Sequence, residues 1–210
     1  MFKALSALFR SRNATPAKQP LNSAEDLNKG DMIKFADSFA LPVDVRDQTF
    51  QVHKISTYFY DDDATPQYVI KSGTTTLYLT INDEAGEELI VLSKALKGKA
   101  LEAAFGRDTL KQATRDESIE QLQAHDADSN EWLAPDYTRR VFGGQGIYYS
   151  RDLRHSVDRP SGGESFRYYE YYFSDDQKSV EMEVWEGDEM EAALSLTRPM
   201  TDIEEFWSTA

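Results

Sequence analysis

Apolar and polar side chains alternate over several short segments of the chain, as they do in β-strands with one buried face. The predicted strands include MIKF (32–35), FQVHKISTYFY (50–60) and TLYLTI (76–81), and ELIVLS (88–93) is apolar enough for a more fully buried strand. Polar turns such as NDEAGEE separate them. We therefore predict a first β module over residues 23–96, an antiparallel meander that curls toward a barrel.

The hydrophobic period changes to that of helices in residues 97–131. Three apolar residues share one face of a first predicted helix: Leu101, Ala104 and Phe105. Gly106 follows them where a C-cap glycine would end that helix. A second helix is predicted to begin at Thr114, which is spaced from Glu117 as in a capping box.

Strand patterns return after residue 131. YTRRVF (137–142) and QGIYYS (145–150) flank Gly143-Gly144, a pair that is typical of a two-residue hairpin turn. EAALSLT (191–197) is the last predicted strand. Thr201 and Glu204 are spaced as a capping box, which predicts a short C-terminal helix.

The predicted fold class is α+β, mainly antiparallel β, with two small β-meander or barrel-like modules joined by a helical connector. A basic amphipathic tail and linker (1–22) precedes a single compact unit (23–210). That unit contains the first β module (23–96), the helical connector and loop (97–131), and the second β module with the C-terminal helix (132–210).

The stretch FRYYEYYFSDDQKSVEMEVWEGDE (166–189) is both aromatic and acidic and reads as a hairpin. The core face of its second strand carries Val180, Met182 and Val184. Glu181, Glu183 and Trp185 point to the opposite face. The two carboxylates are then roughly 6.5–7 Å apart along the strand, a separation that glycosidases use, although charged residues at such positions often serve solubility alone.

The first strand of this hairpin is apolar on both faces. One face carries Tyr169, Tyr171 and Phe173, and the other carries Phe166, Tyr168 and Tyr172. Two interpretations stay open. Either the hairpin is central and covered on both faces, or an aromatic patch is exposed for a protein partner, since tyrosine combines apolar area with a polar tip. The candidate partner surface comprises Tyr169, Tyr171, Phe173 and Trp185.

The composition gives a net charge of −14, an apolar content of 40% and no cysteine. The absence of cysteine excludes disulfides, thiolate nucleophiles and cysteine-based zinc sites. An acidic body repels phosphate backbones, so we expect no nucleic-acid binding. The same charge attracts cations and basic partners, or it serves only to keep the protein in solution.

The N-terminal segment MFKALSALFRSR has the opposite charge and an amphipathic pattern. Its apolar residues Phe2, Leu5, Leu8 and Phe9 share a helical face that is flanked by Lys3, Arg10 and Arg12. It could contact an anionic membrane or a partner, dock on the body, or remain a basic tail. No apolar run reaches the ~20 residues of a membrane span. We expect a cytoplasmic protein with peripheral contact at the inner face of the membrane.

No residue set indicates a cofactor, metal or catalytic site. The histidines lack a partner at zinc-site spacing: His53, His125 and His155. The segment HDADSNE (125–131) matches the first half of a calcium loop, but Glu131 and Tyr137 stand where Gly and Glu are required. There is also no G-x-S-x-G elbow and no phosphate loop. We therefore predict that the protein is not an enzyme.

Several segments together resemble the uncharacterised bacterial YjfK-like proteins and a related domain of unknown function. They are MFKALSALFRSR, L-x-x-G-D at 27–31, TFQVHKI, YVIKSGTTTLYLTI, SFRYYEYYF and VEMEVWEG. The resemblance covers most of the chain from residue 27 and includes no catalytic signature. It implies a cytoplasmic protein of unknown activity. Such genes often lie beside relatives of phage-shock protein A, small membrane proteins, and polyamine or glutathionylspermidine enzymes.

Three functions are consistent with these observations. The first is a non-enzymatic accessory protein that binds an unidentified protein partner in a membrane-stress or envelope-maintenance system. The second is a binder of a small cationic ligand such as a polyamine, because carboxylates and aromatic faces suit a cationic amine. The third is a carboxylate-dependent hydrolase, which would need Glu181 or Glu183 in a deep pocket with a raised pKa. An exposed strand edge would also allow a homodimer.

Overall fold

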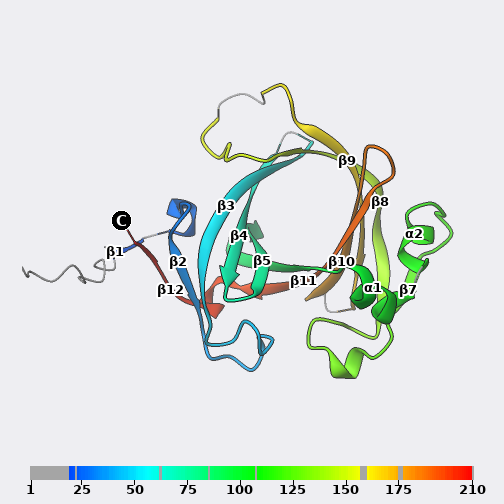
Figure 1. The fold of residues 1–210 in the computed structure, drawn as a ribbon, viewed down its shortest axis with the longest axis horizontal. Helices are drawn as coiled ribbons and strands as arrows, with labels where there is room; N and C mark the ends of the chain where they lie inside the picture. Colours follow the sequence, from blue (N-terminus) through cyan, green and yellow to red (C-terminus); the bar gives the residue numbers. More distant parts are fainter. Residues whose placement is uncertain are drawn as a thin grey trace, which may run out of the picture.

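The fold is a highly curved antiparallel sheet that closes on itself (Figure 1). It was obtained as a computed structural model, which describes residues 19–21, 23–61, 63–84, 86–106, 108–156, 160–174 and 177–209. Within these residues, no helix has the length and apolar composition needed to cross a bilayer.

Eight strands form a closed ring. Each pairs with its two neighbours in antiparallel fashion, and pairing between β3 and β8 at Thr57↔Tyr149 to Tyr60↔Gly146 closes the ring. In spatial order the ring comprises β3 (Thr49–Tyr60), β4 (Asp63–Ser72), β5 (Thr75–Glu84), β6 (Glu87–Ala95), β11 (Met190–Pro199), β10 (Lys178–Trp185), β9 (Glu164–Tyr172) and β8 (Asp136–Tyr149).

The remaining elements lie outside this ring. The sheet continues beyond the first residues of β3 through β2 (Met32–Phe35), β12 (Ile203–Ser208) and β1 (Gln19–Pro20). On the other side, β7 (Gln121–Gln123) pairs with the start of β8. The helices are α1 (Gly98–Phe105) and α2 (Thr109–Ala113), with 3-10 turns η1 (Ala24–Asp26), η2 (Ala127–Ser129) and η3 (Met200–Asp202).

The apolar core lies on the outward face of the ring. The hydroxyl of Tyr68 on β4 donates to the carbonyl of Ala24, and that of Tyr171 on β9 donates to the carbonyl of Ile119, so segments outside the ring cover these strands. Buried residues of this face include Ile70, Leu79, Leu92, Val180 and Met182. The predicted core face of the 180–185 strand is therefore confirmed.

The opposite face of the same strands points into the ring. The ring of Tyr58 on β3 lies 5.5 Å from that of Phe166 on β9, and Tyr148 on β8 lies 5.7 Å from Trp185 on β10. Each pair skips one intervening strand. Such contacts require a concave surface, because side chains on a convex face diverge.

The predicted β-rich antiparallel fold is confirmed, but its finer organisation differs. The two β regions share one sheet, because β3 pairs with β8 and β6 pairs with β11. They are therefore not two separate barrel-like modules. The connector does contain two helices, yet the second ends near Thr114 instead of beginning there.

The predicted hairpin at Gly143-Gly144 is wrong, since β8 runs through both glycines with two register shifts. Glycine is needed here for space. A Cβ at Gly144 would lie 2.4 Å from the ring of Tyr168, and one at Gly146 would lie 2.3 Å from the ring of Phe166.

The predicted C-terminal helix is also wrong, because those residues form β12 beside β2. A helix of about six residues gains little in isolation. The unpaired edge of β2, in contrast, offers hydrogen-bond partners to an extended chain.

Candidate functional site

The inward face of the ring lines a cavity of about 1320 Å³, to which all eight ring strands contribute residues. A closed sheet of eight strands has an interior wide enough for packed side chains or one small ligand. The cavity is therefore the strongest candidate for a binding site among the described residues.

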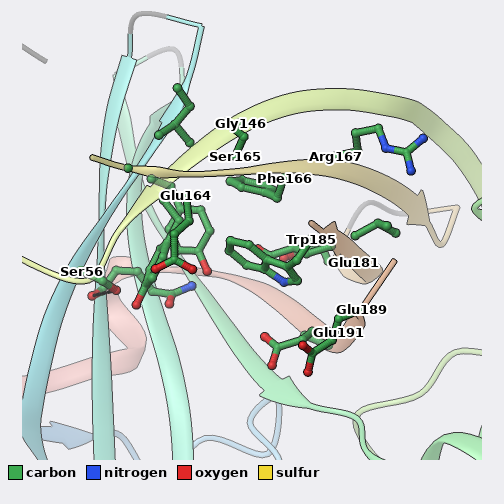
Figure 2. A pocket seen from close by; sticks show the side chains of 18 of the residues that line it. Ser56, Gly146, Glu164, Ser165, Phe166, Arg167, Glu181, Trp185, Glu189 and Glu191 are labelled. Atoms are coloured by element: carbon green, nitrogen blue, oxygen red, sulfur yellow. Dashed lines mark hydrogen bonds between the residues drawn. The ribbon is translucent and has the colours of Figure 1, made fainter. Parts of the chain in front are cut away.

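One wall of the cavity is aromatic. The ring of Tyr58 lies 5.0 Å from that of Tyr148, and Phe166 lies 5.0 Å from Trp185. Figure 2 shows Phe166 and Trp185 beside each other inside the ring. The ring of Trp185 lines the cavity, and its indole N–H is buried without a hydrogen-bond acceptor in the described part of the chain. Gly146 makes room for the ring of Phe166.

A row of carboxylates faces the same interior. Glu181 and Glu183 project from β10 to the inward face, as their alternation with the buried Val180, Met182 and Val184 requires. Glu170 on β9 is paired directly with Glu181. Glu191 on β11 is paired directly with Glu183. Directly opposite residues on paired strands have Cβ atoms about 4.5–5.5 Å apart, so these four carboxylates form one continuous row, of which Glu181, Glu183 and Glu191 line the cavity.

Burial makes Glu170, Glu181 and Glu183 hard to ionise, and repulsion by neighbouring carboxylates adds to this effect at Glu170 and Glu183. Burial, followed by the charges of Glu181 and Glu191, raises the pKa of Glu183 to about 8, although a hydrogen bond with Tyr58 opposes the shift. Burial and the charge of Glu181 raise the pKa of Glu170 to about 7. Burial also raises the pKa of Glu181, against the opposing effect of hydrogen bonds from Ser195 and Ser179.

Basic side chains do not neutralise Glu181 and Glu183 in the middle of this row, although the charge of Arg140 acts on Glu170 and lowers its pKa. Within the described residues, Glu181 and Glu183 form no ion pair with Lys or Arg. Lys54 does line the cavity, but its ammonium donates to the hydroxyl of Tyr148 at 2.7 Å. Lys97 lies 4.0 Å from Glu191 and is largely exposed. Buried carboxylates without counter-ions cost folding energy, which a cationic ligand would offset.

The entrance of the cavity is acidic as well. The β10–β11 turn places Glu186, Asp188 and Glu189 on the lining, and all three are exposed. Of the described residues that line the cavity, eight are acidic and three are basic. A cleft with one predominant sign of charge concentrates ions of the opposite sign, so this entrance favours cations.

The carboxylates do not form a metal centre. In the described ranges, no group of three or more His, Asp or Glu residues converges closely enough to hold a metal ion. The row follows the strands, whereas Ca²⁺ or Mg²⁺ needs six or more oxygens around one point. The arrangement therefore suits an extended cation better than a compact one.

The candidate partner surface is not a single exposed patch. Tyr169 and Tyr171 are 1% and 0% exposed and belong to the core, because the segments outside the ring cover that face of β9. Phe173 packs against the same core. Trp185 lies on the inward face, on the other side of the sheet. The prediction that these four residues form one exposed partner surface is therefore wrong for the single chain.

The other candidate contact residues, Phe2, Lys3, Leu5, Leu8, Phe9, Arg10 and Arg12, lie outside the described residues. Sequence reasoning did identify Glu181, Glu183 and Trp185 as sharing one face. It did not identify Tyr58, Lys54 or Tyr148 as their neighbours. Lys54, Ser56 and Tyr58 alternate along the chain with more apolar residues, and this alternation could have indicated a polar face that points inward.

Comparisons with protein-family models, with curated proteins and with solved structures found no match for this chain. The function must therefore be argued from the cavity itself.

Proposed function

We propose that the protein binds a small organic cation, a protonated amine, in the cavity of the ring. The observation that carries this proposal is that Glu181 and Glu183 face an aromatic wall without a basic partner among the described residues. A protonated amine pairs with carboxylates through its N–H donors, and its charge is attracted to aromatic faces within about 6 Å.

The principal test is calorimetric titration of the full chain with putrescine, with 1,4-butanediol as an uncharged ligand of the same length. We expect saturable binding of the diamine only, and weaker binding as salt is added, because salt screens the acidic entrance. The double variant Glu181→Gln/Glu183→Gln should lose binding. Glu88→Gln, which changes an exposed glutamate outside the cavity, should retain it. Equal binding by all three proteins would contradict the proposal.

A carboxylate-dependent hydrolase is the second candidate. It is supported by Glu183, whose pKa of about 8 keeps the group protonated near neutral pH, as a general acid requires. Glu170 and Glu181 supply further carboxylates in the same row. Assays with chromogenic glycosides would test this candidate. Turnover by the wild type that Glu183→Gln abolishes would support it, and the absence of turnover would count against it.

The accessory-protein function in a membrane-stress system remains a prediction that rests on the N-terminal segment. Pull-down from native lysate with the full chain, and with a form that lacks residues 1–20, would test it. Capture of the same partner by both forms would show that the segment is not required.

A further inference from the structure

The acidic lining of the cavity is ordered along the β10–β11 hairpin. Glu181 and Glu183 are two residues apart on β10, a rise of about 6.5–7 Å along the strand. Glu191 is paired with Glu183 on the neighbouring strand, whereas Glu181 is paired with Ala193. Negatively charged side chains therefore recur at intervals along the direction of the strands.

This direction leads from the interior to the entrance. Glu181 and Glu183 are partly buried, whereas Glu191 and Glu189 are exposed. Figure 2 shows Glu189 and Glu191 close together near the turn of the hairpin. A ligand that follows the hairpin would thus meet carboxylates at its inner end, near its middle and at its outer end.

The surface beside these carboxylates is aromatic. The rings of Phe166 and Trp185 lie 5.0 Å apart, and Tyr58 and Tyr148 continue the same wall. Charged groups separated by methylene segments would match carboxylates that recur along the strands beside this wall of ring faces. A compact cation would reach only one step of the row, and it would leave the other carboxylates without partners.

We propose that the ligand is a linear polyamine that lies extended along β10 and β11. One terminal ammonium is held by Glu181, an inner ammonium lies between Glu183 and Glu191, and the other end reaches the Glu189 side of the entrance. This inference rests on the proposed function, because it specifies the cation that the cavity takes. It adds that the ligand carries two or more charges in a line.

The experiment compares four amines on the full chain by calorimetry at fixed ionic strength: n-butylamine, putrescine, spermidine and tris(2-aminoethyl)amine. The first three place one, two and three amines on a linear chain, and the fourth is a branched amine with several charges close together. Each added charge that meets a carboxylate should tighten binding about tenfold. Spermidine should also bind at least about tenfold more tightly than the branched amine.

Two variants locate the charges. Glu191→Gln should weaken spermidine about tenfold and leave n-butylamine unchanged, because a single ammonium is held deeper in the cavity. Glu181→Gln should weaken both ligands. Glu88→Gln, an exposed change outside the cavity, should weaken neither.

The outcomes separate this inference from the proposed function. If the branched amine binds as tightly as spermidine, or n-butylamine as tightly as putrescine, the linear arrangement is wrong, although the cavity still binds cations. If none of the four amines binds, the proposed function is wrong as well. If the affinity rises from n-butylamine through putrescine to spermidine, and Glu191→Gln reduces this rise, both the linear arrangement and the proposed function are supported.

Discussion

Glu183 shows how one side chain can carry both a stability cost and the binding role that we propose for it. Its carboxyl is held beside Glu181 and Glu191 on the inward face of the ring, and burial raises its pKa to about 8. Below that pH the group is neutral, although its hydrogen bond with Tyr58 favours the ionised form. Above it, the fold must hold an ionised carboxylate beside two others. The site therefore destabilises the fold most when no ligand is bound and Glu183 is ionised.

Glu183→Gln should therefore stabilise the unliganded protein at high pH and not at low pH. The folded pKa of Glu183 lies above the usual 4.5, so its protonated form favours folding at acidic pH, and this contribution is lost as the pH rises through about 8. We expect the variant to gain roughly 1–3 kcal/mol in the free energy of unfolding at pH 9 and almost nothing at pH 5. Solvent reaches part of the Glu183 side chain, and this contact limits the gain at pH 9. Urea unfolding measures both.

The control for this measurement is Glu88→Gln, which removes an exposed carboxylate outside the cavity. It should change stability by less than about 0.5 kcal/mol at either pH. An equal gain from Glu183→Gln at pH 5 and pH 9 would show that ionisation of Glu183 does not oppose folding.

At the scale of elements, the close contact between β8 and β9 shapes the cavity wall. Gly146 lies directly opposite Phe166 in the sheet, and a Cβ at Gly146 would lie 2.3 Å from the far end of that ring. The ring of Phe166 therefore occupies space that a side chain on β8 would fill. Its position beside Trp185 and Tyr58 depends on this glycine.

Gly146→Ala should destabilise the protein by roughly 1–3 kcal/mol, because the methyl group displaces the ring of Phe166. The double variant Gly146→Ala/Phe166→Leu removes the clash, so its loss of stability should be smaller than the sum of the two single losses. Thermal unfolding of the four proteins completes the cycle. Strict additivity would mean that the two residues do not compete for the same space.

The sequence predicts local strands better than their closure into a ring. Alternation correctly places Val180, Met182 and Val184 in the core, and Glu181 and Glu183 on the other face. It does not show that this other face is an interior, because that depends on pairing between β3 and β8, far apart in the chain. Glycine is ambiguous in the same way. Gly143-Gly144 fits a turn locally, but within β8 Gly143 has a positive φ of 69° and Gly144 leaves room for the ring of Tyr168 on β9.

At the scale of the whole molecule, the closed sheet reverses the usual placement of polar and apolar groups. The apolar face is turned outward and is covered by the segments before β3 and between β6 and β8. The interior is left to carboxylates and aromatic rings. Because the chain as a whole carries a net charge of −14, its field guides cations toward the cavity and also makes ionisation of the interior carboxylates harder.

Binding of a polyamine should consequently release protons. At pH 7.5 Glu183 is largely protonated and Glu170 partly so, with pKa values of about 8 and 7. A bound ammonium beside Glu183, which lines the cavity, favours its ionised form and lowers its pKa. Tyr58, which faces Glu183, has a strongly raised pKa and keeps its proton. Glutamates are therefore the source of the protons.

We expect about one proton to be released per spermidine at pH 7.5, and affinity to rise with pH between about 6 and 8, then to fall at higher pH as the amine itself loses charge. Calorimetry in buffers that differ in ionisation enthalpy measures the number of protons directly. Glu183→Gln should reduce this number, because the amide has no proton to release. Heats that do not depend on the buffer would show that the carboxylates of the unliganded cavity are already ionised, and that repulsion between them does not limit binding.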